Sequence, residues 1–464
     1  MYINNARILA SSPLVKGVKN FRFPKVTKDS DVTTALLKRA DEVHEIFVNQ
    51  AADNLLFLHD SWGNDVTSIS RLWYDGANIM ANEMAEKHGL DPDTVAGVLA
   101  ALSPQMDWNM NVRLAEMMIE VLAPLEGDTR PRIFNETIFD KLIEIAERGI
   151  TPAVKKDAKK LQSKLDAIAA FKEELRPYMG MSFDGLPPSI LPYLVRGWTE
   201  VYSDRTYSLL APDGTKVQKA VNAKGEEVNA GRGSYAEIGK AVKILTGKMG
   251  AKRIQEIMGS GHKIRNFFNN ISNPRSEDNS VTIDTHAVAA ATMLPLAAND
   301  AEVKQNFGSG ASSSKEIGYR GTYYIYAEAY KRAAEARNIL PREMQSITWE
   351  AIREMFPAEF KTKANKEAVR EIHNRYEKGE ITIDELRNEI FDKADGIPRP
   401  AWAGQFLPDA DIDAEAKPYD AGVSGEPGDV VGAAIEPGDG DGGDVDVQRA
   451  VRDKEQRPLL ELDK

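Results

Sequence analysis

The heptapeptide IMGSGHK at residues 257–263 joins two segments whose apolar residues recur at helical spacing. Gly259 and Gly261 allow the backbone to turn tightly and leave its N–H groups uncovered. Together with the start of the next helix, these N–H groups form a positive nest that suits a phosphate oxygen. The heptapeptide therefore predicts a helical hairpin that contacts DNA phosphates, with an ordinary helix–helix turn as the alternative.

The charge of the chain is unevenly placed. The net charge is −12, but residues 409–464 contain 16 acidic and 6 basic residues, which leaves the rest of the chain nearly neutral. Residues 240–265 contain seven Lys or Arg residues and one acidic residue. A local basic surface, rather than the total charge, is what meets nucleic acid. We therefore expect Lys252, Arg253 and Arg265 to contact DNA, and the acidic tail to compete with DNA for them. The alternative is a solvated helix face.

Helical periodicity dominates the chain outside its tail. Asp91-Pro92 is a strong helix start, and Ser234 with Glu237 forms a capping-box pattern. The other helices expected from apolar spacing cover about 33–58, 68–88, 108–122, 138–150, 158–175, 252–258, 264–271, 323–338 and 342–356.

Three other stretches lack this periodicity. Residues 1–30 are rich in Pro, Ser and Lys and are expected to be irregular, and Pro187-Pro188 and Pro192 are expected to break the chain. Residues 207–228 contain turn signals between short alternating runs, which predicts one or two small β-hairpins.

The expected fold class is all-α, with a small inserted α+β segment and a disordered acidic tail. The predicted domains are an N-terminal helical segment with the first part of the main fold (1–124), an insertion of helices and short hairpins (125–233), a segment with the helical hairpin and the catalytic residues (234–360), a charged helical pair (361–397) and the acidic tail (398–464).

The composition excludes several classes of site. The chain has no cysteine, which excludes disulfides, thiolate nucleophiles and iron–sulfur clusters. Its six histidines show no paired spacing typical of metal ligands, so we expect no metal and no other cofactor. No apolar stretch is long enough to span a membrane, and the N-terminus does not read as a secretory signal. We expect a cytoplasmic protein, in the host cytoplasm if the chain is viral.

Asp284 and Lys263 are the candidate catalytic residues. Asp284 precedes a helix that starts at Thr285, where the helix dipole keeps a carboxylate ionised. Cleavage of an N-glycosidic bond develops positive charge on the sugar, which a carboxylate stabilises. A lysine amine can attack the sugar C1′ and form a Schiff base, and His262 and Arg265 are cationic neighbours that favour its neutral form. The alternatives are a plain helix cap for Asp284 and a simple phosphate contact for Lys263.

Three segments together resemble the helix-hairpin-helix DNA glycosylases of the endonuclease III type. In chain order, these are VAGVLAALSPQMDWN at 95–109, MGSGHK at 258–263 and TIDTH at 282–286. The same order is found in that family. The resemblance covers about 85–125 and 235–355. It implies a two-lobed helical fold and a base that leaves the DNA stack.

The resemblance also assigns roles to single residues. Lys263 matches the lysine that attacks the sugar, Asp284 matches the catalytic aspartate, and Gln105 matches a residue that fills the gap left by the flipped base. The DNA-binding residues expected from the hairpin and its surroundings, besides Gln105, are Gly259, Gly261, His262, Arg265, Asn266, Lys252 and Arg253.

The chain departs from that family at several points. The loop at 273–280 lengthens the spacing between Lys263 and Asp284, Met258 stands where a proline is usual, and the iron–sulfur cysteines are absent. The pattern also resembles uncharacterised phage-encoded relatives.

The leading functional hypothesis is a DNA glycosylase or glycosylase/lyase that acts on a damaged or modified base, in repair or in modification. The alternatives are a phage enzyme that hypermodifies a base on the same fold, as the thymine-hypermodification pyrophosphorylases do, and a non-catalytic DNA-binding protein. His286 is interpreted as a helix-start residue, Gln105 and Trp108 as packing or capping residues if they do not meet DNA, and Trp349 as a core residue.

Overall fold

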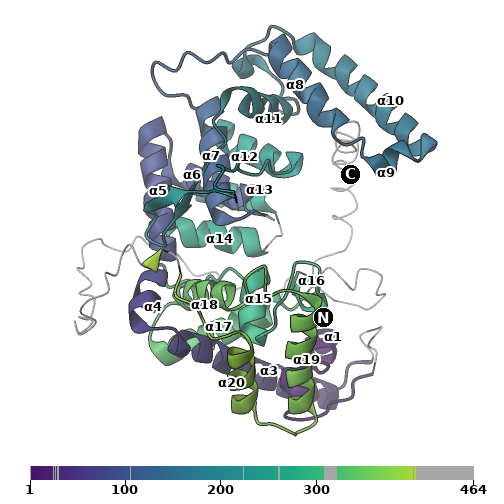
Figure 1. The fold of residues 1–464 in the computed structure, drawn as a ribbon, viewed down its shortest axis with the longest axis vertical. Helices are drawn as coiled ribbons and strands as arrows, with labels where there is room; N and C mark the ends of the chain where they lie inside the picture. Colours follow the sequence, from purple (N-terminus) through teal and green to yellow (C-terminus); the bar gives the residue numbers. More distant parts are fainter. Residues whose placement is uncertain are drawn as a thin grey trace. The chain divides into compact units, whose positions relative to one another are not determined.

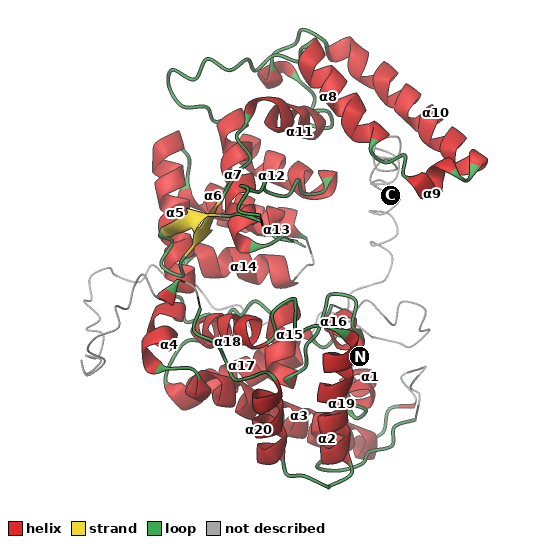
Figure 2. Cartoon of the chain, in the orientation of Figure 1, coloured by secondary structure: helices red, strands yellow, loops and turns green. Residues whose placement is uncertain are grey.

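The structure is a computed structural model, and its described part is mostly helical, with one short two-stranded hairpin (Figure 2). This confirms the expected all-α class with a small β element. The described residues are 2–24, 26, 28, 31–104, 106–222, 224–259, 262–307, 321–400, 402 and 403.

The chain divides into two compact units. Unit 1 contains residues 1–129 and 203–408, and unit 2 contains residues 130–202. The helices and strands of unit 1, labelled in Figure 1, are α1 (Tyr2–Leu9), α2 (Pro13–Lys16), α3 (Thr34–Ser61), α4 (Asn64–Ser70), α5 (Trp73–His88), α6 (Pro92–Leu102), α7 (Trp108–Leu122), β1 (Ser208–Leu210), β2 (Lys216–Lys219), α12 (Tyr235–Gly247), α13 (Ala251–Met258), α14 (His262–Ser272), α15 (Thr285–Thr292), α16 (Ala301–Asn306), α17 (Tyr323–Arg337), α18 (Pro341–Met355), α19 (Lys363–Glu377) and α20 (Ile383–Lys393).

Helix α6 is the centre of one half of unit 1. Every residue from Thr94 to Leu102 is buried, and α6 packs against α5, α7, α12, α13 and α14. Its start is fixed as predicted: the Asp91 side chain accepts from the Asp93 N–H at 2.9 Å, and Pro92 occupies the first turn. A helix that is buried on all sides needs apolar residues on every face. This explains why residues 95–102 are all Val, Ala, Leu or Gly.

Helix α3 organises the other half of unit 1. It packs against α1, α2, α15, α17 and α18, and their buried side chains form one continuous core that extends to α19 and α20. Asn54 of α3 donates from Nδ2 to the carbonyl oxygen of Ala291, in the last turn of α15, at 3.0 Å. The Asn54 Oδ1 accepts from Arg387 Nε at 2.9 Å, so both the nitrogen and the oxygen of this buried amide are hydrogen-bonded.

Several sequence predictions are confirmed and others are wrong. The capping box of Ser234 and Glu237 is present, and α10 begins and ends as predicted. Residues 1–30, predicted to be irregular, instead contain α1 and α2. Ile3, Leu9 and Leu14 are buried because these short helices pack on α3, although their sequence has no long periodic pattern. The single helix predicted at 68–88 is interrupted after α4, because Leu72 leaves helical geometry with ψ at 3°.

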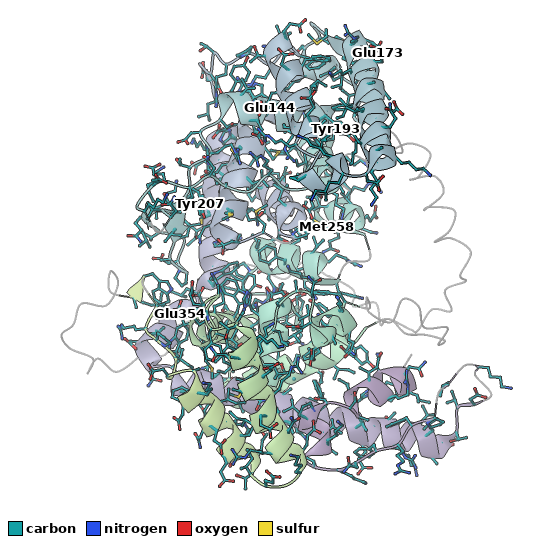
Figure 3. All side chains as sticks on the ribbon, turned by 45° about the vertical axis from the view of Figure 1, so that its right-hand side comes forward. Glu144, Glu173, Tyr193, Tyr207, Met258 and Glu354 are labelled. Carbon is teal, nitrogen blue, oxygen red and sulfur yellow. The ribbon has the colours of Figure 1, made fainter. Side chains whose placement is uncertain are left out.

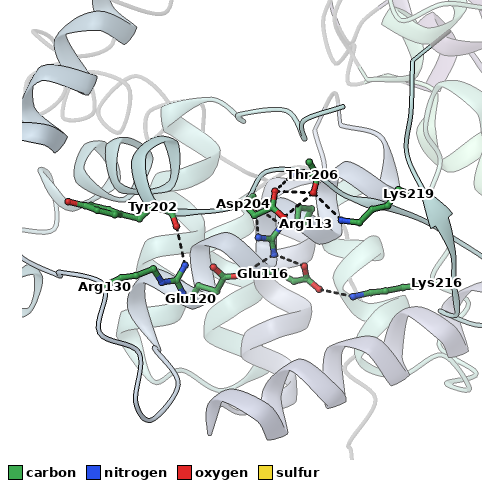
Figure 4. Close-up of polar contacts among 9 residues, drawn as sticks. All are labelled: Arg113, Glu116, Glu120, Arg130, Tyr202, Asp204, Thr206, Lys216 and Lys219. Atoms are coloured by element: carbon green, nitrogen blue, oxygen red, sulfur yellow. Dashed lines mark hydrogen bonds and ion pairs between the residues drawn. The ribbon is translucent and has the colours of Figure 1, made fainter. Parts of the chain in front are cut away.

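The β-hairpin is tied to α7 by a polar cluster (Figure 4). Strands β1 and β2 pair antiparallel, as predicted for this segment. Arg113 of α7 bonds to Glu116 and Glu120 on its own helix, and its Nε donates to the Asp204 carbonyl at 3.0 Å. The Asp204 carboxylate accepts from Thr206, whose hydroxyl also accepts from Lys219 of β2 at 3.0 Å. The hairpin is therefore anchored to the helix that carries one wall of the site described below.

Unit 2 has a core of its own. It contains α8 (Glu136–Glu147), α9 (Pro152–Lys155), α10 (Ala158–Leu175) and α11 (Leu191–Tyr202). Tyr193 of α11, labelled in Figure 3, packs edge-on to Phe171 of α10 with ring centroids 5.4 Å apart. Trp198 is fully buried and donates to the Pro131 carbonyl at 2.7 Å. Pro192 does not break the chain as predicted, because it lies in the first turn of α11, where no helical N–H bond is lost.

No helix in the described part of the chain is both long enough and apolar enough to cross a lipid bilayer.

Candidate functional site

The hairpin predicted from the heptapeptide is formed by α13 and α14, which pack against each other. Gly259 ends α13 with φ at +71°, a conformation that favours glycine, and Gly261 lies outside the described residues. Gly97 of α6 lets α13 approach, because a Cβ there would lie 2.8 Å from Ile254 Cγ2. These contacts hold Lys263, at the start of α14, against the body of unit 1.

The segment before Asp284 is held by one side chain of α14 and one of α17. Tyr323 donates from its hydroxyl to the Val281 carbonyl at 2.8 Å and accepts from the Ile283 N–H at 2.9 Å. Asn266 donates to the same Val281 carbonyl and to the Tyr323 hydroxyl, each at 3.1 Å. Burial raises the pKa of Tyr323, which keeps its hydroxyl a donor. The position of Asp284 relative to α14 is thus fixed by hydrogen bonds.

The loop that lengthens the spacing between Lys263 and Asp284 is held by Arg342 of α18. This side chain is fully buried, and its guanidinium donates to the carbonyls of Asn273 and Ser276 and to the Asp278 carboxylate. Five donors in a rigid fork suit such a set of acceptors. Residues 273–280 therefore form an ordered loop on the chain path from α14 to Asp284.

Replacing Arg342 by Met is expected to lower the free energy of unfolding by roughly 2–4 kcal/mol, because three acceptors lose a buried partner. The measurement is urea unfolding at neutral pH. Arg275→Met is the matched control, since Arg275 lies in the same loop, is exposed and pairs with Asp75 at 3.3 Å. It should cost less than about 1 kcal/mol. Equal losses in the two variants would contradict the anchoring role of Arg342.

Unit 1 contains a cavity walled by aromatic rings. Trp73 lies with its ring centroid 4.7 Å from Trp108, 5.8 Å from Trp349 and 6.0 Å from Phe267. Lys263 and Asp284 both line the same cavity. The structure thus brings together the two candidate catalytic residues, whereas Gln105 lies outside the described residues.

Asp284 is held in one orientation by two donors. It caps α15 as predicted, with Oδ1 accepting from the Ala287 N–H at 2.9 Å, and Oδ2 accepts from Trp349 Nε1 at 3.2 Å. Arg353 lies over the Trp349 ring at 4.3 Å and pairs with Asp107 at 3.5 Å. Trp349 is therefore not the core residue that the sequence predicted: it is half-buried, lines the cavity and orients the aspartate.

His286 lies beside Asp284 as a neutral imidazole. Burial lowers the pKa of His286 to about 4, against the opposing effect of the Asp284 charge, and Lys361, Arg353 and Lys263 lower it further. Its ring meets Trp349 edge-on with centroids 5.8 Å apart. His286 therefore stays uncharged at neutral pH, and it lies in the first turn of α15, as the sequence indicated.

The cavity opens into a wider groove with basic side chains. The groove shares Lys263, Asp284 and Trp349 with the cavity and continues along residues that include His262, Lys304 and Arg353. The His262 ring lies over Tyr323 with centroids 5.5 Å apart. The lining of the groove thus combines Lys263, Lys304 and Arg353 with the carboxylates of Asp107 and Asp284.

A comparison with protein-family models matches residues 38–153 and 214–356 to a family of unknown function (DUF7178). The chain belongs to this family. The matched ranges contain every residue that lines the aromatic cavity, so the cavity lies in the part of the chain that defines the family. No curated protein and no solved structure matches the chain in the corresponding searches.

The other predicted DNA-binding residues of this family member fall into two groups. Lys252, Arg253, His262 and Arg265 are exposed on α13 and α14, and Arg253 also pairs with Glu256. Asn266 is half-buried, and its amide nitrogen is used in the two internal bonds described above.

Sequence analysis missed Trp73, Phe267 and Arg353 as site residues. Aromatic residues at helical spacing are typical of a core, and nothing in the local pattern indicates that these rings enclose a cavity. Among the described residues, no three His, Asp or Glu side chains lie where they could hold a metal ion.

Proposed function

We propose that this chain binds DNA and acts on a base rotated out of the double helix, with Asp284 and Lys263 directed at the N-glycosidic bond. The observation that carries the proposal is the convergence of these two side chains on one aromatic cavity. The resemblance of its three ordered motifs to helix-hairpin-helix DNA glycosylases supports the same function.

The cavity provides the physical requirements of base extrusion. A flipped base loses its stacking partners at a cost of a few kcal/mol. The rings of Trp73, Trp108, Phe267 and Trp349 offer replacement surfaces, and stacking on an aromatic side chain is worth about 1–3 kcal/mol per base. The cavity can therefore hold a planar base outside the duplex.

The chemistry follows from the two polar groups. As the bond between base and sugar breaks, the base leaves with the bonding electron pair and positive charge develops at C1′. The Asp284 carboxylate stabilises this charge, because its donors already fix its orientation. A new bond to C1′ then forms from water or from the Lys263 amine. Attack by the amine leads to a Schiff base after nitrogen loses its protons and the sugar ring opens.

A second candidate function is remodelling of the base rather than its release. The groove that adjoins the cavity continues to Lys304 and Arg353, which leaves room for a second, anionic reactant beside the base. Both functions use the same cavity.

The direct test is a mass-spectrometric screen for bases released from DNA, including modified viral DNA, with borohydride present in a parallel reaction. Glycosylase action predicts a free base, and attack by Lys263 predicts a trapped protein–DNA adduct that Lys263→Ala abolishes. Release without trapping assigns the nucleophile to water. A changed base without release favours remodelling, and DNA binding with neither product leaves the non-catalytic alternative.

The basic face of α13 and α14 predicts a measurable salt dependence. Replacing Lys252, Arg253 and Arg265 by Ala is expected to weaken binding to all DNA sequences alike and to reduce the slope of log K against log salt by about 2–3. The measurement is fluorescence anisotropy of a labelled duplex at several salt concentrations. Three exposed lysines of unit 2, Lys156, Lys159 and Lys160, provide the charge-matched control. An unchanged slope in the triple variant would indicate that DNA does not bind to this face of α13 and α14.

A further inference from the structure

The aromatic cavity contains a buried amide with one unused acceptor. Asn111, in the first turn of α7, is 1% exposed and lines the cavity. Its Nδ2 donates to the Leu99 carbonyl at 2.9 Å, in the last turn of α6, where carbonyls lack helical partners. Its Oδ1 has no hydrogen-bond partner in the described part of the chain. Because a buried acceptor without a partner is costly to the fold, this oxygen indicates a donor on the occupant of the cavity.

Three hydroxyls that line the cavity with Asn111 already donate to other acceptors. Tyr74 donates to the Gln345 Oε1 at 2.7 Å, and burial raises the pKa of Tyr74 to about 12, so its hydroxyl keeps the proton. The hydroxyls of Ser103 and Ser346 donate to the carbonyls of Ala100 and Glu343. The protons of these three hydroxyls are thus used elsewhere, and the Asn111 Oδ1 is buried without a hydrogen-bond partner in the described residues.

We propose that Asn111 determines which bases the cavity accepts, because its Oδ1 receives a hydrogen bond from an N–H on the edge of a planar base held among the aromatic rings. This inference rests on the proposed function, since the occupant is the flipped base. A base whose N–H is replaced or methylated leaves the buried oxygen unpaired. A site built to hydrogen-bond its ligand rejects analogues that lack the matching group.

The test measures nucleoside binding by the full chain without any chemical step. Trp73, Trp108 and Trp349 line the cavity, so quenching of tryptophan fluorescence reports its occupancy. The probes are pairs that differ at one N–H: deoxyadenosine against purine deoxyriboside, thymidine against 3-methylthymidine, and deoxycytidine against its N4,N4-dimethyl derivative. At least one parent nucleoside should bind roughly tenfold more tightly than its partner.

The variants separate ligand recognition from the structural bond to Leu99. In Asn111→Leu the preference should fall to near unity, and Asn111→Ala serves the same purpose if the leucine variant does not fold. Asn111→Asp keeps an acceptor and should retain much of the preference. Asn54→Leu is the matched control, because Asn54 is a buried amide that also caps a helix carbonyl but lies outside the cavity lining. It should lower stability and leave the preference unchanged.

The inference is overturned if no nucleoside quenches the fluorescence up to its solubility limit, if no pair shows a preference, or if the preference survives in Asn111→Leu. The outcomes also distinguish a failure of this inference from a failure of the proposed function. A preference that depends on Asn111 in a chain that processes no base supports a base-binding site and contradicts the catalytic function. Base release by a chain whose preference does not depend on Asn111 supports the catalytic function and contradicts the role proposed for Asn111.

Discussion

Replacing Asp284 by Asn is expected to slow base release by about 10²–10³-fold while the fold is retained. The substitution removes the negative charge that faces the sugar and keeps a side chain that is also a good helix cap. An amide has only one oxygen, so it can accept from Ala287 or from Trp349 but not from both. We therefore expect a loss of stability of only about 1 kcal/mol.

The measurement is single-turnover base release on the substrate found in the screen, together with the unfolding midpoint of each variant. Trp349→Phe is the control, because it removes the Nε1 donor and keeps the ring and the Asp284 charge. In the Trp349→Phe background, Asp284→Asn should cost little further stability and still lose the activity. Full activity in Asp284→Asn would leave helix capping as the role of Asp284.

The second large effect is a loss of folding stability at acidic pH. Burial lowers the pKa of His44 and of His373 to about 4, from an ordinary value of 6.5. As the pH falls below 6.5 the unfolded chain takes up these protons before the folded chain does. The stability due to each neutral histidine is fully present above about pH 6.5 and is lost as the pH approaches 4. Each loss amounts to roughly 3 kcal/mol.

His373→Gln should flatten the pH dependence of unfolding between pH 6.5 and 4.5 by up to about 1.4 kcal/mol per pH unit. The ring of His373 is buried against the Met293 carbonyl, and its Nδ1 has no partner in the described part of the chain. Urea midpoints at a series of pH values measure the slope. His59→Gln, at a partly exposed site beside Asp60, is the control. A slope equal to that of the unchanged chain would contradict the buried neutral histidine.

Local signals predicted those parts of the fold that local chemistry determines. The caps at Asp91, Ser234 and Asp284 are carried by the residues expected, because a short polar side chain before a helical run satisfies its first N–H groups. The convergence of Lys263 and Asp284 on one cavity also matches the expectation from their motifs.

Features that depend on tertiary contacts were not predicted. Helix α1 is too short to be stable without α3, and its buried Asn4 and Asn5 make its sequence look like a loop. Trp349 looks like a core residue because its helical position is apolar, but its indole N–H faces Asp284. Asn111 has no distinctive sequence context, and only its place between Leu99 and the cavity gives it a role.

The way Arg342 holds the loop at 273–280 affects how this region can evolve. Two of the three acceptors are main-chain carbonyls, at Asn273 and Ser276, which every residue type provides. Side chains at these two positions are therefore free to drift without loss of the anchor. The constraint falls instead on the side chains of Asp278 and of Arg342, 64 residues apart, so the other positions of the loop can diversify while Asp284 keeps its place.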